Sequence, residues 1–110
     1  MLLVRGSAGG AGLTGTLYEP GDVAPSFRGA PDDGAPYVWV CDAFYEVESG
    51  GQRQRIGDRV LRVAFESPAP RGFADRDAAL AAARDHVRTQ FARLGVPAED
   101  VVVTVTPAAD

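Results

Sequence analysis

Few side chains in this 110-residue sequence are of the types that perform chemistry, and they are scattered along it. His86 is the sole histidine and Cys41 the sole cysteine. A metal site needs three or four ligands, and a catalytic base needs a partner, which this pair does not supply. Cys41 follows Trp39 and Val40 in an apolar run that is typical of a buried strand, so its thiol is expected to be inert. We expect no metal, no cofactor and no catalytic residue, and lean against an enzyme.

A cluster of basic residues is the strongest candidate for a contact surface. Arg53, Arg55, Arg59 and Arg62 lie within ten positions, and the preceding strand contains Tyr45 among other aromatic residues. Arginines beside exposed aromatic rings are typical of a site for single-stranded nucleic acid. The alternative is that the aromatic residues belong to the core and that nearby carboxylates pair with the arginines. The sequence therefore indicates a nucleic-acid or partner surface and leaves the choice open.

Three arginines that each precede a glycine suggest a separate anion site. Arg5, Arg28 and Arg71 are expected in loops, and Arg71 comes shortly before a predicted helix, whose N-terminus favours an anion. If the loops converge, Arg28, Arg71 and Gly72 would bind an anion or ligand. This hypothesis places the site of a small enzyme or ligand-binding domain between the glycine loop, residues 6–15, and residues 67–73.

The glycine loop contains Gly10, Gly12 and Gly15 at the GxGxxG spacing. In a dinucleotide site a helix must begin at the third glycine, so that its N-terminus faces the pyrophosphate. Here residues 14–18 favour a strand, and Glu19-Pro20-Gly21-Asp22 turns the chain at once. A mobile or tightly turning glycine loop is therefore expected in place of a nucleotide loop.

One helix, predicted over Asp75–Leu94, must position much of the chain. Apolar residues recur at spacings of three and four, Asp75 is suited to cap the N-terminus, and Gly95 and Pro97 follow the last turn. The predicted apolar stripe consists of Leu80, Ala83, Val87, Phe91 and Leu94. A second side of this helix is lined with small residues, Ala78, Ala81, Ala82 and Ala92. A homodimer through this side, or through an edge strand, is the favoured partner hypothesis.

Strands are predicted on both sides of the helix. Residues 37–48 are rich in aromatic and β-branched types and change alternation near Asp42, which indicates a bulge or a bend. With residues 53–56 and 59–66 they are expected to form a three-stranded meander in which Leu61, Val63 and Phe65 point inward. Residues 2–5 and 101–106 supply further strands, and residues 19–36 form a long loop rich in Pro, Gly and Asp. The expected fold is one α+β domain over residues 1–110: a four- to five-stranded, mostly antiparallel sheet with one long helix on one face.

The composition of the chain indicates which partners and which cellular compartment to expect. The 11 basic residues are all arginine, the 15 acids give a net charge of −4, and such a surface repels nucleic acid on average. No apolar run approaches the roughly 20 residues that span a bilayer, so no membrane is expected. A single cysteine cannot form an internal disulfide, which favours the cytoplasm. Missing lysine fits a GC-rich genome, and with the acid excess it fits a salt-in halophile.

Four segments carry a resemblance that covers nearly the whole chain: LVRGSAGG near the start, SFRGAPDDGAPYVWVCDAFYEV in the middle, and VAFESPAPRGF and HVRTQFARLGV towards the end. In these segments the chain resembles an uncharacterised haloarchaeal family, a domain of unknown function. The resemblance implies a salt-in archaeal cytoplasm and carries no activity with it.

Three functions remain open from the sequence. The leading hypothesis is a small non-enzymatic binding or interaction module, acidic and homodimeric. The second is a nucleic-acid-binding module that uses the arginines of residues 53–62. The third is the small enzyme or ligand-binding domain with its site near residues 67–73.

Overall fold

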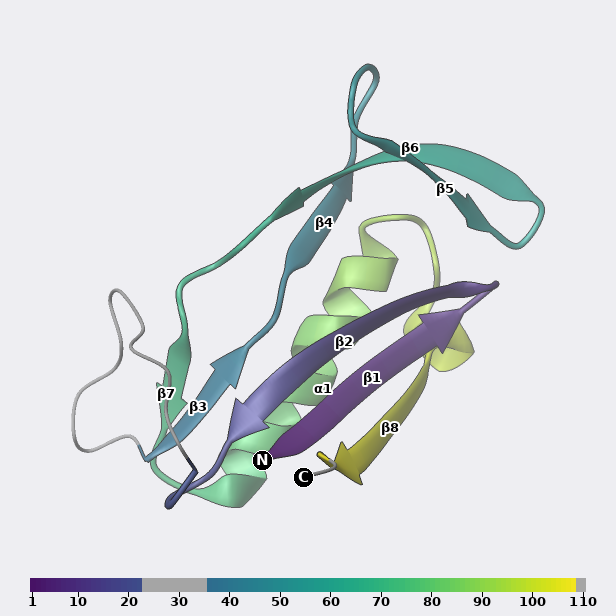
Figure 1. The fold of residues 1–110 in the computed structure, drawn as a ribbon. Helices are drawn as coiled ribbons and strands as arrows, with labels where there is room; N and C mark the ends of the chain where they lie inside the picture. The colour runs from purple at the N-terminus through teal and green to yellow at the C-terminus, as the bar shows by residue number, and fades with distance from the viewer. Residues whose placement is uncertain (23–35, 109–110) are drawn as a thin grey trace.

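A computed structural model describes residues 1–22 and 36–108 of the chain. It confirms an α+β fold in which antiparallel strands form two sheets and one helix packs on the larger sheet (Figure 1). The predicted long loop falls mostly on residues 23–35, outside the described residues. Only its first turn is seen, where the backbone N–H of Asp22 donates to the carbonyl of Glu19 over 3.1 Å.

The larger sheet has five strands in the order β7-β3-β2-β1-β8, and every neighbouring pair is antiparallel. The strands are β1 (Leu2–Ala8), β2 (Ala11–Tyr18), β3 (Tyr37–Val40), β7 (Arg71–Phe73) and β8 (Val102–Pro107). The first and last strands lie side by side, because Leu2 pairs with Pro107 (Figure 1). One edge of this sheet is therefore β8 and the other is the three-residue β7.

The glycine loop is a β-hairpin. Gly9 and Gly10 have φ of 55° and 88°, and they form the two-residue connection between β1 and β2. Two successive positive φ values match the twist of a tight hairpin and are easily adopted by glycine. A strand follows these glycines where a dinucleotide site requires a helix, as the sequence predicted.

Helix α1 (Arg76–Ala92) packs on β1, β2, β3 and β7. The Asp75 side chain caps it by accepting from the backbone N–H of Ala78 over 2.8 Å, as expected. The buried positions differ in part from the predicted stripe, since Leu80 is only half-buried. The buried residues within α1 are Ala79, Ala83, Val87, Gln90 and Phe91.

Two glycines let the helix and a large ring approach the sheet closely. A Cβ at Gly6 would collide with Val87 and touch Phe91 of the helix, and a Cβ at Gly15 would collide with the Trp39 ring. Trp39 itself is among the largest fully buried side chains. These glycines therefore supply space in the core, a role that their sequence spacing does not reveal.

The smaller sheet comprises β4 (Ala43–Glu46), β5 (Gln52–Ile56) and β6 (Arg59–Glu66), in the order β4-β6-β5. This order corrects the predicted meander: β6 is central, and β4 pairs with its C-terminal half while β5 pairs with its N-terminal half. The inward prediction also fails for Phe65, which is 48% exposed, although Val63 is buried.

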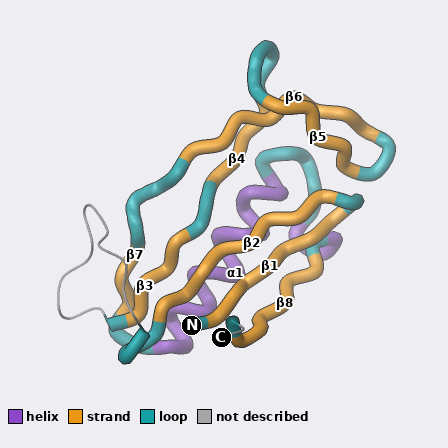
Figure 2. Tube along the Cα trace, in the orientation of Figure 1, coloured by secondary structure: helices purple, strands orange, loops and turns teal. Residues whose placement is uncertain are grey.

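Two long antiparallel segments, residues 37–46 and 59–73, run through both sheets and form a two-stranded ribbon that is interrupted in the middle. β3 continues into β4 across Cys41 and Asp42, and β6 continues into β7 across residues 67–70, so the breaks face each other (Figure 2). The break at Asp42 lies where the sequence predicted a bend. It separates a body that carries the helix from a projecting arm formed by the smaller sheet (Figure 1).

Among the described residues, three hydrogen bonds connect the arm to the body. The backbone N–H of Gly57 donates to the carbonyl of Gly9 over 2.8 Å, between the tips of two hairpins. The buried backbone N–H of Phe44 donates to Oε1 of Gln90 over 3.1 Å. Arg59 donates from Nη2 to the carbonyl of Leu94 over 2.7 Å, just beyond the end of α1.

Candidate functional site

The predicted arginine cluster lies on the arm. The register of β5 and β6 shows on which side of the hairpin each arginine lies. Arg53 on β5 stands directly opposite Arg62 on β6, and Arg55 stands opposite Val60. Opposed residues of an antiparallel pair share a face, and so do residues two apart along a strand. Arg53, Arg55 and Arg62 are therefore on one side of the arm, together with Val60. We call this side the arginine face.

Arg59 does not belong to the arginine face. It stands opposite Ile56, which is buried, and its guanidinium lies beside Gly95 and bonds to the Leu94 carbonyl. A cation at this place satisfies a free carbonyl and suits the negative end of the helix dipole. The structure thus separates one arginine that is bonded to the end of the helix from three that lie on the arginine face.

The three solvent-facing arginines have no carboxylate within 4.0 Å among residues 1–22 and 36–108, where the ion pairs involve only Met1 or Arg76. Arg55 donates from Nε to the Gly57 carbonyl over 3.1 Å, and Arg62 donates from Nη1 to the Gly50 carbonyl over 3.4 Å. The alternative in which nearby carboxylates pair with them does not hold here. Like charges that directly oppose each other destabilise a strand pair, so Arg53 and Arg62 weaken the hairpin.

Aromatic residues of the ribbon divide between the core and the surface. Trp39 and Phe44 are buried, and Phe44 meets Phe91 edge-on at 5.5 Å between ring centroids. Tyr45 is 41% exposed and stands opposite Ala64, two residues from Arg62 on the same strand. An exposed phenol ring therefore borders the arginine face. Val60, in the middle of the face, is 63% exposed.

A polar cluster that the sequence did not reveal forms at the break in the ribbon. Ser67 donates from Oγ to Oδ1 of Asp42 over 3.2 Å, and Nε2 of His86 lies 3.0 Å from the backbone oxygen of Asp42. Because that oxygen can only accept, Nε2 of His86 is the donor. A Ser-His-Asp relay requires the hydroxyl to bond to the imidazole, and here it bonds to the carboxylate. The cluster braces the break and has no geometry for nucleophilic catalysis.

Cys41 lies in the same break, and the structure places its thiol in the core. Burial, with a smaller contribution from the neighbouring Asp42 carboxylate, raises the pKa of the Cys41 thiol to about 12. The reactive species of a cysteine is the thiolate, which is scarce near neutral pH at such a pKa. This arrangement agrees with the inert core residue that the sequence predicted.

The residues proposed for an anion site are not brought together among those described. Arg71 is exposed, with its guanidinium 5.3 Å from the centroid of Phe73, and Gly72 pairs with Val38 inside the sheet. The helix N-terminus nearby already holds the Asp75 carboxylate. Arg28 lies outside the described residues.

The glycine loop is also remote from β7. Its tip contacts the turn at Gly57 on the arm, whereas Gly72 borders the far end of β2 through Val38 and Tyr18. The two segments named for a ligand site thus lie at opposite ends of the larger sheet (Figure 1). One small cavity, of about 20 Å³, lies between the arm and the body, and that space suits a single water molecule.

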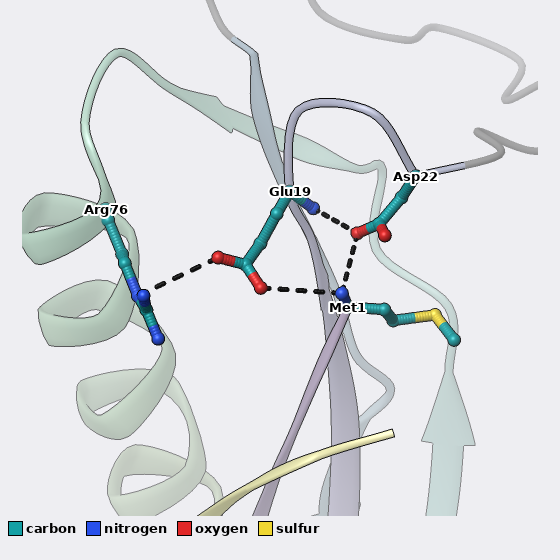
Figure 3. Close-up of polar contacts among 4 residues, drawn as sticks. All are labelled: Met1, Glu19, Asp22 and Arg76. Carbon is teal, nitrogen blue, oxygen red and sulfur yellow. Dashed lines mark hydrogen bonds and ion pairs between the residues drawn. The ribbon is translucent and has the colours of Figure 1, made fainter. Parts of the chain in front are cut away.

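A salt-bridge cluster joins the N-terminus to the start of the helix (Figure 3). The Met1 amino group lies 2.8 Å from Oδ2 of Asp22 and 3.4 Å from Oε1 of Glu19, and Arg76 approaches Glu19 at 3.8 Å. The hydrogen bond to Asp22 raises the pKa of the Met1 amino group, and the same bond lowers the pKa of Asp22. Each of the four charged groups forms an ion pair with another member of the cluster, so the cluster has a structural role.

None of the helices among the described residues is long and apolar enough to cross a membrane. A known family of unknown function, DUF7113, matches residues 1–107. No curated protein and no solved structure matches the chain. Because the match covers almost the full sequence, the chain belongs to this family.

Proposed function

We propose that this member of DUF7113 is a non-enzymatic binding module whose contact surface is the arginine face. The observation that carries the proposal is the set of Arg53, Arg55 and Arg62 on one side of a hairpin, without a carboxylate partner in the described part of the chain. The whole chain has a net charge of −4, so this concentration of positive charge runs against its composition.

The arrangement is unfavourable for the isolated protein and favourable for a complex. Arg53 and Arg62 repel each other across the strands, and an anion held between them would remove that repulsion. Features that weaken a fold locally tend to occur where a function requires them. An anionic partner is therefore the class that fits this surface.

Single-stranded nucleic acid is the anionic partner that the neighbouring residues favour. Tyr45 offers an exposed ring at the border of the face, and a base stacked on an aromatic side chain contributes about 1–3 kcal/mol. Arginines in a row bind successive phosphates, because the guanidinium donates in a fork that matches phosphate oxygens. An acidic protein segment would use the arginines and gain little from the ring.

The proposed function is set in a cytoplasm with a high salt concentration. The absence of lysine, the acid excess and the resemblance to haloarchaeal sequences support a role in a salt-rich cytoplasm. Molar salt screens exposed charges within a few ångströms, so a contact there must rely on direct hydrogen bonds and stacking. Arginine and tyrosine supply both.

The test measures binding of a short fluorescent single-stranded RNA by anisotropy over a range of KCl concentrations. The double variant Arg53→Gln/Arg62→Gln is compared with Arg84→Gln/Arg88→Gln, which removes the same charge from the helix. We expect only the first to weaken binding, and to reduce the salt slope by about 1.4, since each single-strand phosphate contact contributes about 0.7. Equal effects of the two variants would overturn the arginine face as the contact surface.

Tyr45 separates the two partner classes. We expect Tyr45→Ala to weaken RNA binding about 5- to 150-fold, the equivalent of about 1–3 kcal/mol, and Tyr45→Phe to preserve it. Competition by polyglutamate, together with indifference to Tyr45→Ala, would instead indicate an acidic protein partner. Absence of binding to RNA and polyglutamate alike would refute the proposed function.

A further inference from the structure

Strand β8 leaves one edge of the larger sheet open. It pairs with β1 on one side only, and no described strand pairs with its other side. An open edge presents unpaired N–H and C=O groups that another strand can bind. Natural proteins usually protect such edges with charges, bulges, short strands or covering segments.

Two other edge strands among the described residues, β7 and β5, show such protection, whereas β8 shows little. β7 has only three residues, and the outer strand β5 carries two arginines. β8 reads VVTVTP, with no charged residue and with proline only at its last position. Arg5, the nearest charge on the adjoining strand, is directed towards β2, where Nη1 donates to Oγ1 of Thr14 over 3.1 Å.

The faces of β8 are also incompletely covered. Val103 and Val105 point to the helix side and are only half-buried, at the margin of the core. Val102, on the opposite face, is 62% exposed, and Thr104 and Thr106 beside it are exposed as well. A strand placed against β8 would complete both the backbone pairing and the cover over the two half-buried valines.

We infer that a second copy of this chain pairs with β8, strand to strand and antiparallel, to form a continuous ten-stranded sheet across a two-fold axis. Equivalent surfaces must meet in such a dimer, and β8 is complementary to itself. With Thr104 opposite Thr104 of the second copy, Val103 stands opposite Val105, and Val102 opposite Thr106. In this register, opposed side chains of the two copies lie on the same face of the sheet. A shift by one residue would place them on opposite faces.

The charge distribution permits a second copy to approach along this edge. Two chains of net charge −4 repel each other over most of their surfaces. The segment 101–107 contains no ionisable side chain, so the approach along β8 brings neutral β-branched residues together. Such cross-strand pairs stabilise a sheet by about 0.2–1 kcal/mol each. The inference is independent of the arginine face, which lies on the arm.

The first experiment is sedimentation equilibrium of the full chain in high KCl, with two matched lysine variants. Thr104→Lys places two ammonium groups opposite each other at the axis, whereas Thr89→Lys adds the same charge to an exposed helix position. We expect the native chain and Thr89→Lys to be dimers, and Thr104→Lys to be a folded monomer by circular dichroism. A native chain that remains monomeric at every concentration would overturn the inference.

A cysteine scan in a Cys41→Ala background tests the register and remains informative if the lysine variant fails to fold. Directly opposed strand residues lie within the Cα separation that a disulfide spans, about 4.4–6.8 Å. We expect Thr104→Cys to oxidise to a covalent dimer, and Val102→Cys to cross-link only when mixed with Thr106→Cys. A dimer that resists all of these cross-links while Ala81→Cys forms one would place the interface on the helix instead.

Discussion

Gln90 holds the arm against the helix, and its removal gives a sharp test of the structure. It is 3% exposed, and its Oε1 accepts from the buried backbone N–H of Phe44 over 3.1 Å. We consider Gln90→Met, which preserves the length of the side chain and removes the acceptor. The N–H of Phe44 then stays buried without a partner.

The size of the effect follows from that orphaned group. A buried donor without an acceptor costs about 1–3 kcal/mol, whereas loss of a balanced hydrogen bond costs about 0.5–1.5 kcal/mol. Gln90 also accepts from Nη1 of Arg93 at 3.3 Å, a partly exposed contact that adds little. We therefore expect the free energy of unfolding to fall by about 1–3 kcal/mol, which lowers Tm by about 4–8 °C per kcal/mol in a domain near this size.

Urea unfolding reports this loss through the fluorescence of Trp39, the only tryptophan, which is buried near the same break. Gln52→Met on the exposed part of β5 is the matched control and should change stability by less than about 0.5 kcal/mol. Hydrogen exchange at the Phe44 amide should accelerate in Gln90→Met alone. If Gln90→Met is as stable as the control and the Phe44 amide stays protected, Gln90 does not hold the arm in the way described.

Three further perturbations test other parts of the fold. Gly6→Ala should destabilise by about 1–3 kcal/mol in thermal unfolding, because the new Cβ collides with Val87 in a packed core. The difference in stability between native protein and Asp22→Asn should form a plateau over pH. It should shrink as pH rises through the raised pKa of the Met1 amino group, whose usual value is 8.0, and shrink as pH falls below the usual Asp value of 3.8, towards the lowered pKa of Asp22. The Cys41 thiol should react with a disulfide reagent at pH 8 only after denaturation, and stability should decline above pH 9, where the unfolded thiol ionises and the folded thiol, with a pKa of about 12, does not.

Local features of the fold were predictable from the sequence. The helix begins after Asp75 and ends before Gly95, because capping and positive φ depend on neighbouring residues alone. The bend at Asp42 was visible as a change of alternation. The type of the helix and of most strands follows from such short-range signals, whereas Arg5 and Arg71, which were expected in loops, lie in β1 and β7.

Pairings between distant strands were not predictable in the same way. The central place of β6 depends on which strands meet, and alternation within a strand carries no information about that. The burial of Gln90 was missed because its partner, Phe44, lies 46 positions away, and polar residues rarely occupy a core.

The candidate site was predictable only in part. Alternation places Arg53 and Arg55 on one side of a strand, but their lack of carboxylate partners depends on the register with β6. The separate role of Arg59 required the position of the helix end. The cluster of Asp42, Ser67 and His86 joins three segments with no shared spacing, so it could not be predicted from the sequence.

The pairing of β1 with β8 also constrains the order in which the protein can fold during synthesis. β1 is translated first and needs a partner on each side, and one of them consists of residues 102–107. While the ribosome makes the intervening residues, the nascent β1–β2 hairpin has an unsatisfied flank that chaperones or neighbouring chains can bind. Contacts across this sequence separation also slow the closing step. The five-stranded sheet is therefore completed late, when β8 joins β1.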